Sequence, residues 1–224
     1  MKFADITNLL EKLGIKIPET FWKEEIVRFI TESRSERIVE IPLVLNYIPQ
    51  KQSKILDIGC RYSLLPIQLA SLGHEVYGID IYPYKRRHPN LRFFRKDFRQ
   101  SPFKDNFFDV VISLSTIEHI GLGFYKEARN PEGDKEALEE TRRVLKPEGT
   151  LLLTVPFGQP IDSGWYKVYD RKRISKLLSA FNVSVIKVFA EMNGIWQPLS
   201  INKAEKMDST GRVKAVIFIS AKKK

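Results

Sequence analysis

The stretch KILDIGCRYSLLPIQLASLGHEVYGID, residues 54–80, decides the fold. A short apolar run that contains Asp57 ends in a loop at Gly59, a helix-like segment covers residues 64–72, and a second apolar run ends on Asp80. This order predicts a strand, a loop, a helix and a parallel strand. Because parallel sheets bind ligands at the carboxyl ends of their strands, both acids are expected at the ligand-binding edge.

The loop of this unit differs from the loops that bind phosphate groups. A dinucleotide site needs G-x-G-x-x-G, whereas here only Gly59 is present, and Arg61 and Ser63 stand where further glycines would be. No G-x-x-x-x-G-K-[ST] loop occurs in the chain. Asp80 follows the loop by about 20 residues, the distance at which a carboxylate reaches ribose hydroxyls. The sequence therefore predicts a ligand with a ribose and no phosphates to hold, or else a strand–helix–strand unit without a ligand.

Length and composition set further bounds. A chain of 224 residues with 43% hydrophobic residues is long enough for one well-packed domain, with or without a helical extension. No run of 18 apolar residues occurs, so no membrane span is expected. The single cysteine and the absence of a signal-peptide pattern favour a cytoplasmic protein. The net charge of +10 favours acidic partners such as nucleic acid, acidic lipid surfaces or phosphorylated substrates.

The first 50 residues have the pattern of helices. Ile6, Leu9, Leu10 and Leu13 share one helical face, and a further helix is expected over residues 38–48. We expect residues 1–50 to form a helical extension that serves as a structural brace, a dimer contact or a lid. The α/β domain is expected to cover residues 51–224.

The rest of the chain alternates between strands and helices. Strands are expected over residues 91–95, 106–115, 150–155, 183–189 and 213–220, and helices over residues 135–145 and 170–181. Residues 190–212 are expected to form a long connection between the last two strands. The segment 106–115 has a nearly continuous apolar run, which is typical of a central parallel strand.

Two stretches resemble a known family. Residues 54–80 resemble motifs I and II of the class I S-adenosylmethionine-dependent methyltransferases, with matches at Asp57, Gly59 and Asp80 and a departure over Cys60–Ser63. The run LEETRRVLKPEGTLLLTVP closely resembles the type 11 methyltransferases. The resemblance covers about residues 51–221. It implies a Rossmann-like, doubly wound sheet of seven strands, mostly parallel, with an antiparallel last strand inserted beside its predecessor.

The resemblance also implies the cofactor S-adenosylmethionine and the residues that bind it. Asp57 would meet the methionine amino group, Asp80 the two ribose hydroxyls and Asp97 the adenine amino group. The full set of expected cofactor-binding residues is Asp57, Gly59, Cys60, Arg61, Asp80, Ile81, Asp97, Phe98, Ser113, Leu114 and Ser115.

His119 is the candidate catalytic base, because it lies beside the expected methyl-transfer site and has an ordinary pKa near neutrality. The alternative is that it only shapes the pocket. No metal site is expected, because Ser115 stands where the related metal-dependent RNA enzymes have an acid and no histidine follows His119.

The methyl acceptor is open. The stretch STIEHIGLGFYKEARNPEGD resembles proteins of polysaccharide-building gene clusters, which implies a small-molecule or glycan hydroxyl. The basic segments at residues 85–87 and 171–173 favour a tRNA or rRNA substrate instead. A third hypothesis is a non-catalytic subunit that binds the cofactor weakly. Trp165, Tyr166 and Tyr169 are expected either in an acceptor pocket or in the core. The oligomeric state does not follow from the sequence.

Overall fold

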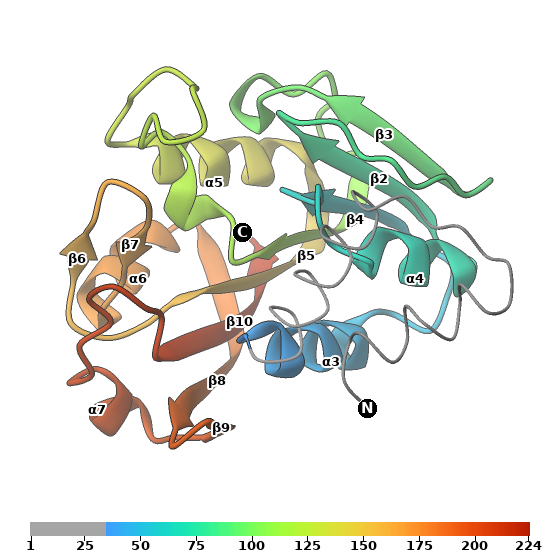
Figure 1. Cartoon of the computed structure of the whole chain (residues 1–224). Helices are drawn as coiled ribbons and strands as arrows, with labels where there is room; N and C mark the ends of the chain where they lie inside the picture. Colours follow the sequence, from blue (N-terminus) through green and yellow to red (C-terminus); the bar gives the residue numbers. More distant parts are fainter. Residues whose placement is uncertain (1–34) are drawn as a thin grey trace, which may run out of the picture.

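A twisted sheet with helices on both faces forms the centre of the molecule (Figure 1). The computed structural model describes residues 35–224. Within that range eight strands form one sheet, in the order β3-β2-β1-β4-β5-β10-β8-β9. Its strands are β1 (Lys54–Ile58), β2 (Glu75–Asp80), β3 (Leu91–Arg95), β4 (Phe108–Leu114), β5 (Leu145–Pro156), β8 (Phe181–Met192), β9 (Ile195–Pro198) and β10 (Ala215–Lys223). β6 (Ile161–Asp162) and β7 (Lys167–Val168) form a separate small ribbon.

The pairing directions explain where the ligand-binding edge lies. β1 pairs in parallel with β2 and β4, β2 with β3, and β4 with β5, so these strands end at one edge of the sheet. β10 is antiparallel to both β5 and β8 and lies between them. The expectation of a mostly parallel, Rossmann-like sheet with an inserted antiparallel last strand is therefore confirmed.

Successive residues of a strand point to opposite faces of the sheet. Both faces carry apolar side chains here, and helices cover both. Ile55 packs in one apolar cluster with α3 (Arg37–Tyr47) and α4 (Leu65–Ser71). Leu56, its neighbour, packs in the other cluster with α5 (Gly133–Val144) and α6 (Arg171–Leu177). The short elements are α7 (Ile201–Ala204) and the 3₁₀ turns η1 (Phe98–Gln100) and η2 (Ile117–His119).

The sheet has eight strands rather than the expected seven. The extra strand, β9, pairs with β8 through a two-residue turn at Asn193 and Gly194. Both turn residues have positive φ angles, 54° and 82°, which is the backbone of a type I′ hairpin turn. The sequence Asn-Gly is the strongest short signal for such a turn, and the long connection expected over residues 190–212 contains this hairpin.

The expected N-terminal extension is described only in part. Its last helix appears as α3, close to the predicted range of 38–48, whereas the helices expected before residue 35 lie outside the described residues. Among the helices of residues 35–224, none combines the length and the apolar character needed to cross a membrane.

Candidate functional site

A cavity of about 1030 Å³ opens at the carboxyl ends of β1, β2 and β4. It brings together ten of the twelve residues expected in the site, namely Asp57, Gly59, Arg61, Asp80, Ile81, Asp97, Phe98, Leu114, Ser115 and His119. Cys60 and Ser113 are not among the residues that line it, and both are buried beside it. The strand ends therefore place residues that are far apart in sequence around one space.

Asp80 is held by the loop that follows β1. Its two carboxylate oxygens accept hydrogen bonds from the backbone N–H groups of Arg61 (3.0 Å) and Tyr82 (2.8 Å). Burial raises the pKa of Asp80, and the two N–H donors partly offset that effect. Because each oxygen keeps one further acceptor position, the carboxylate is oriented to accept from two more donors, such as a pair of hydroxyl groups.

Asp57 is the most deeply buried acid at the floor of the cavity. Its side chain is 2% exposed, and Oδ2 has no hydrogen-bond partner among the described residues. Burial raises its pKa to about 7, although the nearby cation Arg37 opposes the rise and Asp80 adds to it. A buried carboxylate oxygen without a partner is costly, so this atom is suited to a cationic ligand group.

The loop that follows β1 is tightly packed, which accounts for its two small residues, Gly59 and Cys60. Gly59 has a φ angle of +73°, and a Cβ there would lie 2.3 Å from the side chain of Thr116. Cys60 packs against Gly78, where a Cβ would meet its Sγ at 2.8 Å, and burial raises the pKa of the thiol. The glycine thus makes room for Thr116, and the cysteine is a buried packing residue rather than a nucleophile.

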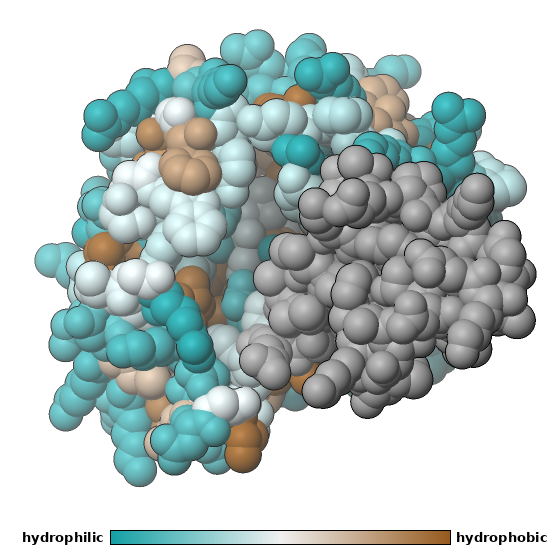
Figure 2. All heavy atoms as spheres, in the orientation of Figure 1, coloured by the Kyte–Doolittle hydropathy of each residue, from teal (hydrophilic) through white to brown (hydrophobic). Residues whose placement is uncertain are grey.

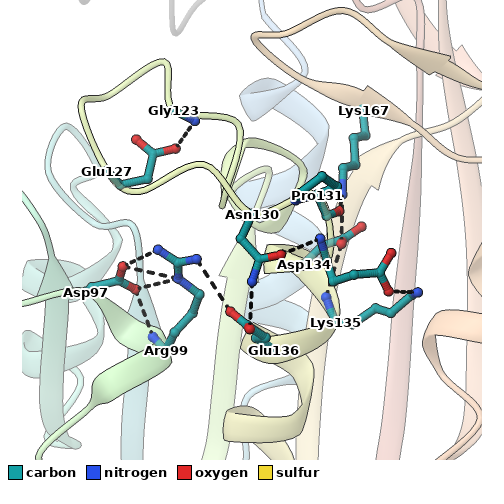
Figure 3. Close-up of polar contacts among 11 residues, drawn as sticks. Asp97, Arg99, Gly123, Glu127, Asn130, Pro131, Asp134, Lys135, Glu136 and Lys167 are labelled. Carbon is teal, nitrogen blue, oxygen red and sulfur yellow. Dashed lines mark hydrogen bonds and ion pairs between the residues drawn. The ribbon is translucent and has the colours of Figure 1, made fainter.

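The carboxylate of Asp97 pairs with the guanidinium of Arg99 (Figure 3). Its carboxylate accepts hydrogen bonds from the backbone N–H, Nε and Nη2 of Arg99. Although partial burial raises the pKa of Asp97, these bonds bring it below its ordinary value. Arg99 also contacts Glu136 on α5, which bonds to Asn130. Asp97 therefore ties the edge of the cavity to α5, besides lining the cavity itself.

The first described helix reaches into the site. Arg37 on α3 donates from Nη1 to the carbonyl of Leu114 (2.7 Å) and to Glu40 (2.9 Å). Glu40, which is fully buried, accepts a 2.6 Å hydrogen bond from the hydroxyl of Ser115. Ser115 has a φ angle of +41°, an uncommon conformation for a residue with a side chain. The helix thus fixes the backbone immediately after β4.

His119 lies at the end of η2 with its ring in a defined tautomer. Nδ1 is 2.6 Å from the carbonyl oxygen of Trp165, and a carbonyl can only accept, so Nδ1 carries the proton. In the neutral ring Nε2 is then the acceptor. Burial lowers the pKa of His119, and the Trp165 carbonyl partly offsets that effect. The ring is therefore neutral at pH 7, with a lone pair available on Nε2.

A second buried acid lies next to His119. Glu118 is almost fully buried, and Oε1 is 3.9 Å from Nε2 of His119, beyond hydrogen-bond reach. Burial raises the pKa of Glu118 well above its ordinary value and so favours the uncharged carboxyl. Because an uncharged Glu118 does not stabilise a protonated imidazole, the neutral form of His119 is favoured.

None of the three aromatic residues expected in an acceptor pocket or in the core lines the cavity. Tyr166 and Tyr169 are buried, and their hydroxyls donate to the carbonyl of Ser209 and to Asp134. Trp165 is 45% exposed and lies with its ring centroid 5.7 Å from that of His119. Trp165 does not line the cavity, and its link to the site is the contact of its backbone carbonyl with His119.

Comparison with known proteins supports the resemblance to methyltransferases. Residues 56–153 match the profile of the family described as "Methyltransferase domain", type 11. The demethylmenaquinone methyltransferase of Chlorobaculum parvum is 26% identical over 188 residues, which cover 80% of this chain and 67% of that protein. This chain spans 60–67% of the length of three curated quinone-biosynthesis methyltransferases that it matches.

Solved methyltransferase structures share the fold. A methyltransferase in complex with the Haloferax volcanii activator Trm112 has a TM-score of 0.64 at 17% identity, covering 93% of this chain and 99% of that one. The 1,6-didemethyltoxoflavin-N1-methyltransferase of Burkholderia thailandensis, solved with its substrate and S-adenosylhomocysteine, has a TM-score of 0.58 at 14% identity and covers 93% of this chain and 92% of that one.

The fold, the cavity at the strand ends and the matching family profile define a class I S-adenosylmethionine-dependent methyltransferase. Within that class, residues 56–153 match the type 11 domain. The expected cofactor class is thereby confirmed.

Sequence reasoning missed Arg37, Glu40 and Tyr125, which all contribute to the site. Arg37 and Glu40 lie outside the stretch that resembles the family, and a three-residue spacing on a helix does not show which loop the pair contacts. Tyr125 lies in a loop without periodicity. The one available signal was the cluster of aromatic residues at Phe124 and Tyr125, close to the candidate base.

Proposed function

We propose that the protein transfers a methyl group from S-adenosylmethionine to a hydroxyl of a small molecule or glycan precursor. The observation that carries this proposal is the neutral His119, with Nδ1 bonded to the Trp165 carbonyl and Nε2 left as an acceptor, on the wall of the cavity that holds Asp57 and Asp80. When bound, the cofactor supplies an activated methyl group. The chain's own residues supply binding, alignment and proton removal.

The residues of the cavity fit this cofactor. Asp80 keeps two oriented acceptor positions for ribose hydroxyls, and the partnerless Oδ2 of Asp57 suits an amino group. Phe98 and Ile81 give apolar contact beside them. Arg37 lines the same cavity and adds a positive charge that suits a carboxylate.

The main task of such an enzyme is to hold donor and acceptor in line. The backbone after β4 is held by Arg37 and Glu40, so the acceptor side of the cavity is fixed before a ligand binds. His119 then needs only to remove one proton from the acceptor hydroxyl. General base catalysis of this kind contributes about 10²–10⁴-fold.

The proposal is tested by incubating the protein with methyl-labelled S-adenosylmethionine and either nucleotide sugars, phenols or bulk tRNA. Label in a small molecule is the expected result.

A binding measurement tests the role of Asp80. Asp80→Ala is expected to weaken cofactor binding tenfold or more. The exposed Asp208→Ala is the matched control, with unchanged affinity. A folded Asp80→Ala protein with unchanged affinity would contradict the role given to Asp80.

RNA methylation is the second candidate. Lys85, Arg86 and Lys96 line the cavity, so basic side chains stand at the site itself. Such groups bind phosphates and make binding depend steeply on salt. Label in tRNA rather than in a small molecule would favour this candidate.

Asp57 is expected to make cofactor binding depend on pH. With a pKa of about 7, the carboxyl is largely protonated below that pH and must lose its proton to pair with a cationic amino group. The dissociation constant of S-adenosylhomocysteine should therefore rise about tenfold between pH 8 and pH 6. Calorimetric titration at both pH values measures this change.

Asp57→Asn provides the control for this pH dependence. The amide keeps the size of the side chain and does not titrate, so binding should be weaker and nearly independent of pH. Equal affinity of the unaltered protein at pH 6 and pH 8 would show that Asp57 does not pair with the amino group.

A further inference from the structure

The loop after β1 is the part of the site that departs from the family pattern. The departure covers Cys60–Ser63, and Arg61 and Ser63 stand where a glycine-rich loop would have further glycines. Glycines let a backbone approach a ligand closely, but they add no side-chain contacts that hold the backbone in place. Large side chains at these positions offer such contacts.

Asp80 is oriented by the backbones of two loops. Its carboxylate accepts hydrogen bonds from the N–H groups of Arg61, in the loop after β1, and of Tyr82, in the loop after β2. The side chains of the same two residues also contact each other, because the guanidinium carbon of Arg61 lies 4.2 Å from the ring centroid of Tyr82. Asp80, Arg61 and Tyr82 therefore form a closed unit, in which backbone bonds and a side-chain contact join the two loops.

A second aromatic ring holds the same guanidinium. The guanidinium carbon of Arg61 lies 4.5 Å from the ring centroid of Tyr62, and both ring contacts are within the range of a cation–π interaction. Within residues 35–224 this guanidinium forms no ion pair, so the two rings are the groups that hold it. We call Arg61, Tyr62 and Tyr82 the arginine stack. A planar guanidinium stacks on rings in a way that the ammonium of lysine does not.

Two further hydrogen bonds connect the arginine stack to its surroundings. The Tyr84 hydroxyl donates to the backbone carbonyl of Ser63 (2.9 Å), which is a second link between the loops after β1 and β2. The Tyr82 hydroxyl donates to the backbone carbonyl of Tyr125 (3.2 Å), in the loop after η2. Three loops are thus joined beside Asp80 before a ligand binds. A site that is ordered in advance loses little conformational freedom on binding.

The arginine stack lies at the opening of the cavity and outside the core. All three of its residues line the cavity, and Tyr62 is 61% exposed. Figure 2 shows the surface hollowed beside the loops near α5 and β6–β7, with hydrophilic as well as apolar residues at its edge. None of the three residues belongs to either apolar cluster of the core. Replacing Arg61 therefore leaves no void in the core, and the variant is expected to fold.

We propose that Arg61 is a positioning residue, which holds Asp80 in the orientation that accepts both ribose hydroxyls of the cofactor. The rings of Tyr62 and Tyr82 hold the guanidinium, the held side chain fixes the loop, and the backbone N–H of Arg61 orients the carboxylate. This inference rests on the role of Asp80 in the proposed function and adds a residue that acts through Asp80. The altered loop is then a replacement for a glycine-rich loop and not the remnant of a lost site.

The test is calorimetric titration of the full chain with S-adenosylhomocysteine and with its 2′-deoxyribose analogue. The unaltered protein should bind the ribose form about tenfold tighter or more, because the analogue leaves an oxygen of Asp80 without its donor. Arg61→Ala should weaken binding of the ribose form about tenfold and bring the preference for ribose below about threefold. Arg61→Lys keeps the charge and should lose less than Arg61→Ala. Arg87→Ala alters an exposed arginine that does not line the cavity, and this matched control should change neither value.

A double variant shows whether Arg61 acts through Asp80. R61A/D80A should bind S-adenosylhomocysteine within about twofold of Asp80→Ala, because the loss of Asp80 removes what Arg61 positions. Additive losses would overturn the inference, as would an Arg61→Ala protein that keeps the full preference for ribose. Failure of the unaltered protein to bind S-adenosylhomocysteine would instead overturn the proposed function, so the two failures are distinct.

Discussion

Replacing His119 by glutamine is expected to lower kcat/KM about 100-fold or more. Glutamine keeps a donor for the Trp165 carbonyl but cannot take a proton, whereas Nε2 of the neutral imidazole can. The affinity for S-adenosylhomocysteine should change less than threefold, because His119 acts on the acceptor. The measurement is labelled methyl transfer to the acceptor identified with the unaltered protein.

The pH profile gives His119 a second, independent signature. Because burial lowers its pKa, the base stays unprotonated at neutral pH, and at saturating cofactor the rate should fall only as the pH drops below that lowered pKa. His119→Gln should lack this acidic limb. His88→Gln, which alters a histidine in the loop after β2, is the control and should retain the full rate. If His119→Gln kept more than a third of the rate, the residue would only shape the pocket.

Replacing Arg37 by methionine is expected to destabilise the fold by about 3 kcal/mol at pH 8. Arg37 is the cationic partner of Glu40, whose side chain is fully buried, and it also satisfies the Leu114 carbonyl. Without Arg37, the buried Glu40 carboxylate would lose its cationic partner and keep the uncharged hydroxyl donors of Ser115 and Thr154. Urea denaturation followed by circular dichroism measures the loss.

The sign of the pH dependence identifies the cause of this loss. Burial already raises the pKa of Glu40, and removal of the cation raises it further. A raised folded-state pKa makes stability fall as the pH rises above the ordinary value of about 4.5. The defect of Arg37→Met should therefore be smaller at pH 5 than at pH 8.

Two further variants control the Arg37 experiment. The double variant R37M/E40Q removes both charges and should recover about 1 kcal/mol or more relative to Arg37→Met. Arg171→Met breaks a surface pair with Glu205 and should leave the stability nearly unchanged. Equal losses for Arg37→Met and Arg171→Met would show that the α3 contacts do not stabilise the site.

The strand–loop–helix–strand unit was predictable because its signals are local. Asp57 and Asp80 close neighbouring parallel strands, and the strand order alone brings both to the cavity. The same logic placed Asp97, Leu114 and Ser115 at that edge. Strand ends follow from hydrophobic patterning, so these positions can be found without knowledge of the tertiary structure.

The contacts of α3 and the contact between His119 and Trp165 could not be predicted in the same way. Arg37 contacts Leu114 across 77 residues of sequence, and His119 contacts Trp165 across 46. No rule of sequence spacing predicts either contact, because each depends on how a loop or helix packs against the sheet. The β9 hairpin differs from these cases, since its Asn-Gly turn was present in the sequence as a local signal.

The central claim is that the cavity at the strand ends binds S-adenosylmethionine. Calorimetric titration of the full chain with S-adenosylmethionine, S-adenosylhomocysteine and NAD tests it most directly. We expect micromolar binding of the two sulfur ligands and no binding of NAD, because Asp80 and Asp57 offer partners for hydroxyl and amino groups and the loop lacks the glycines that hold a pyrophosphate. Absence of binding by either sulfur ligand would contradict it and would favour a non-catalytic subunit.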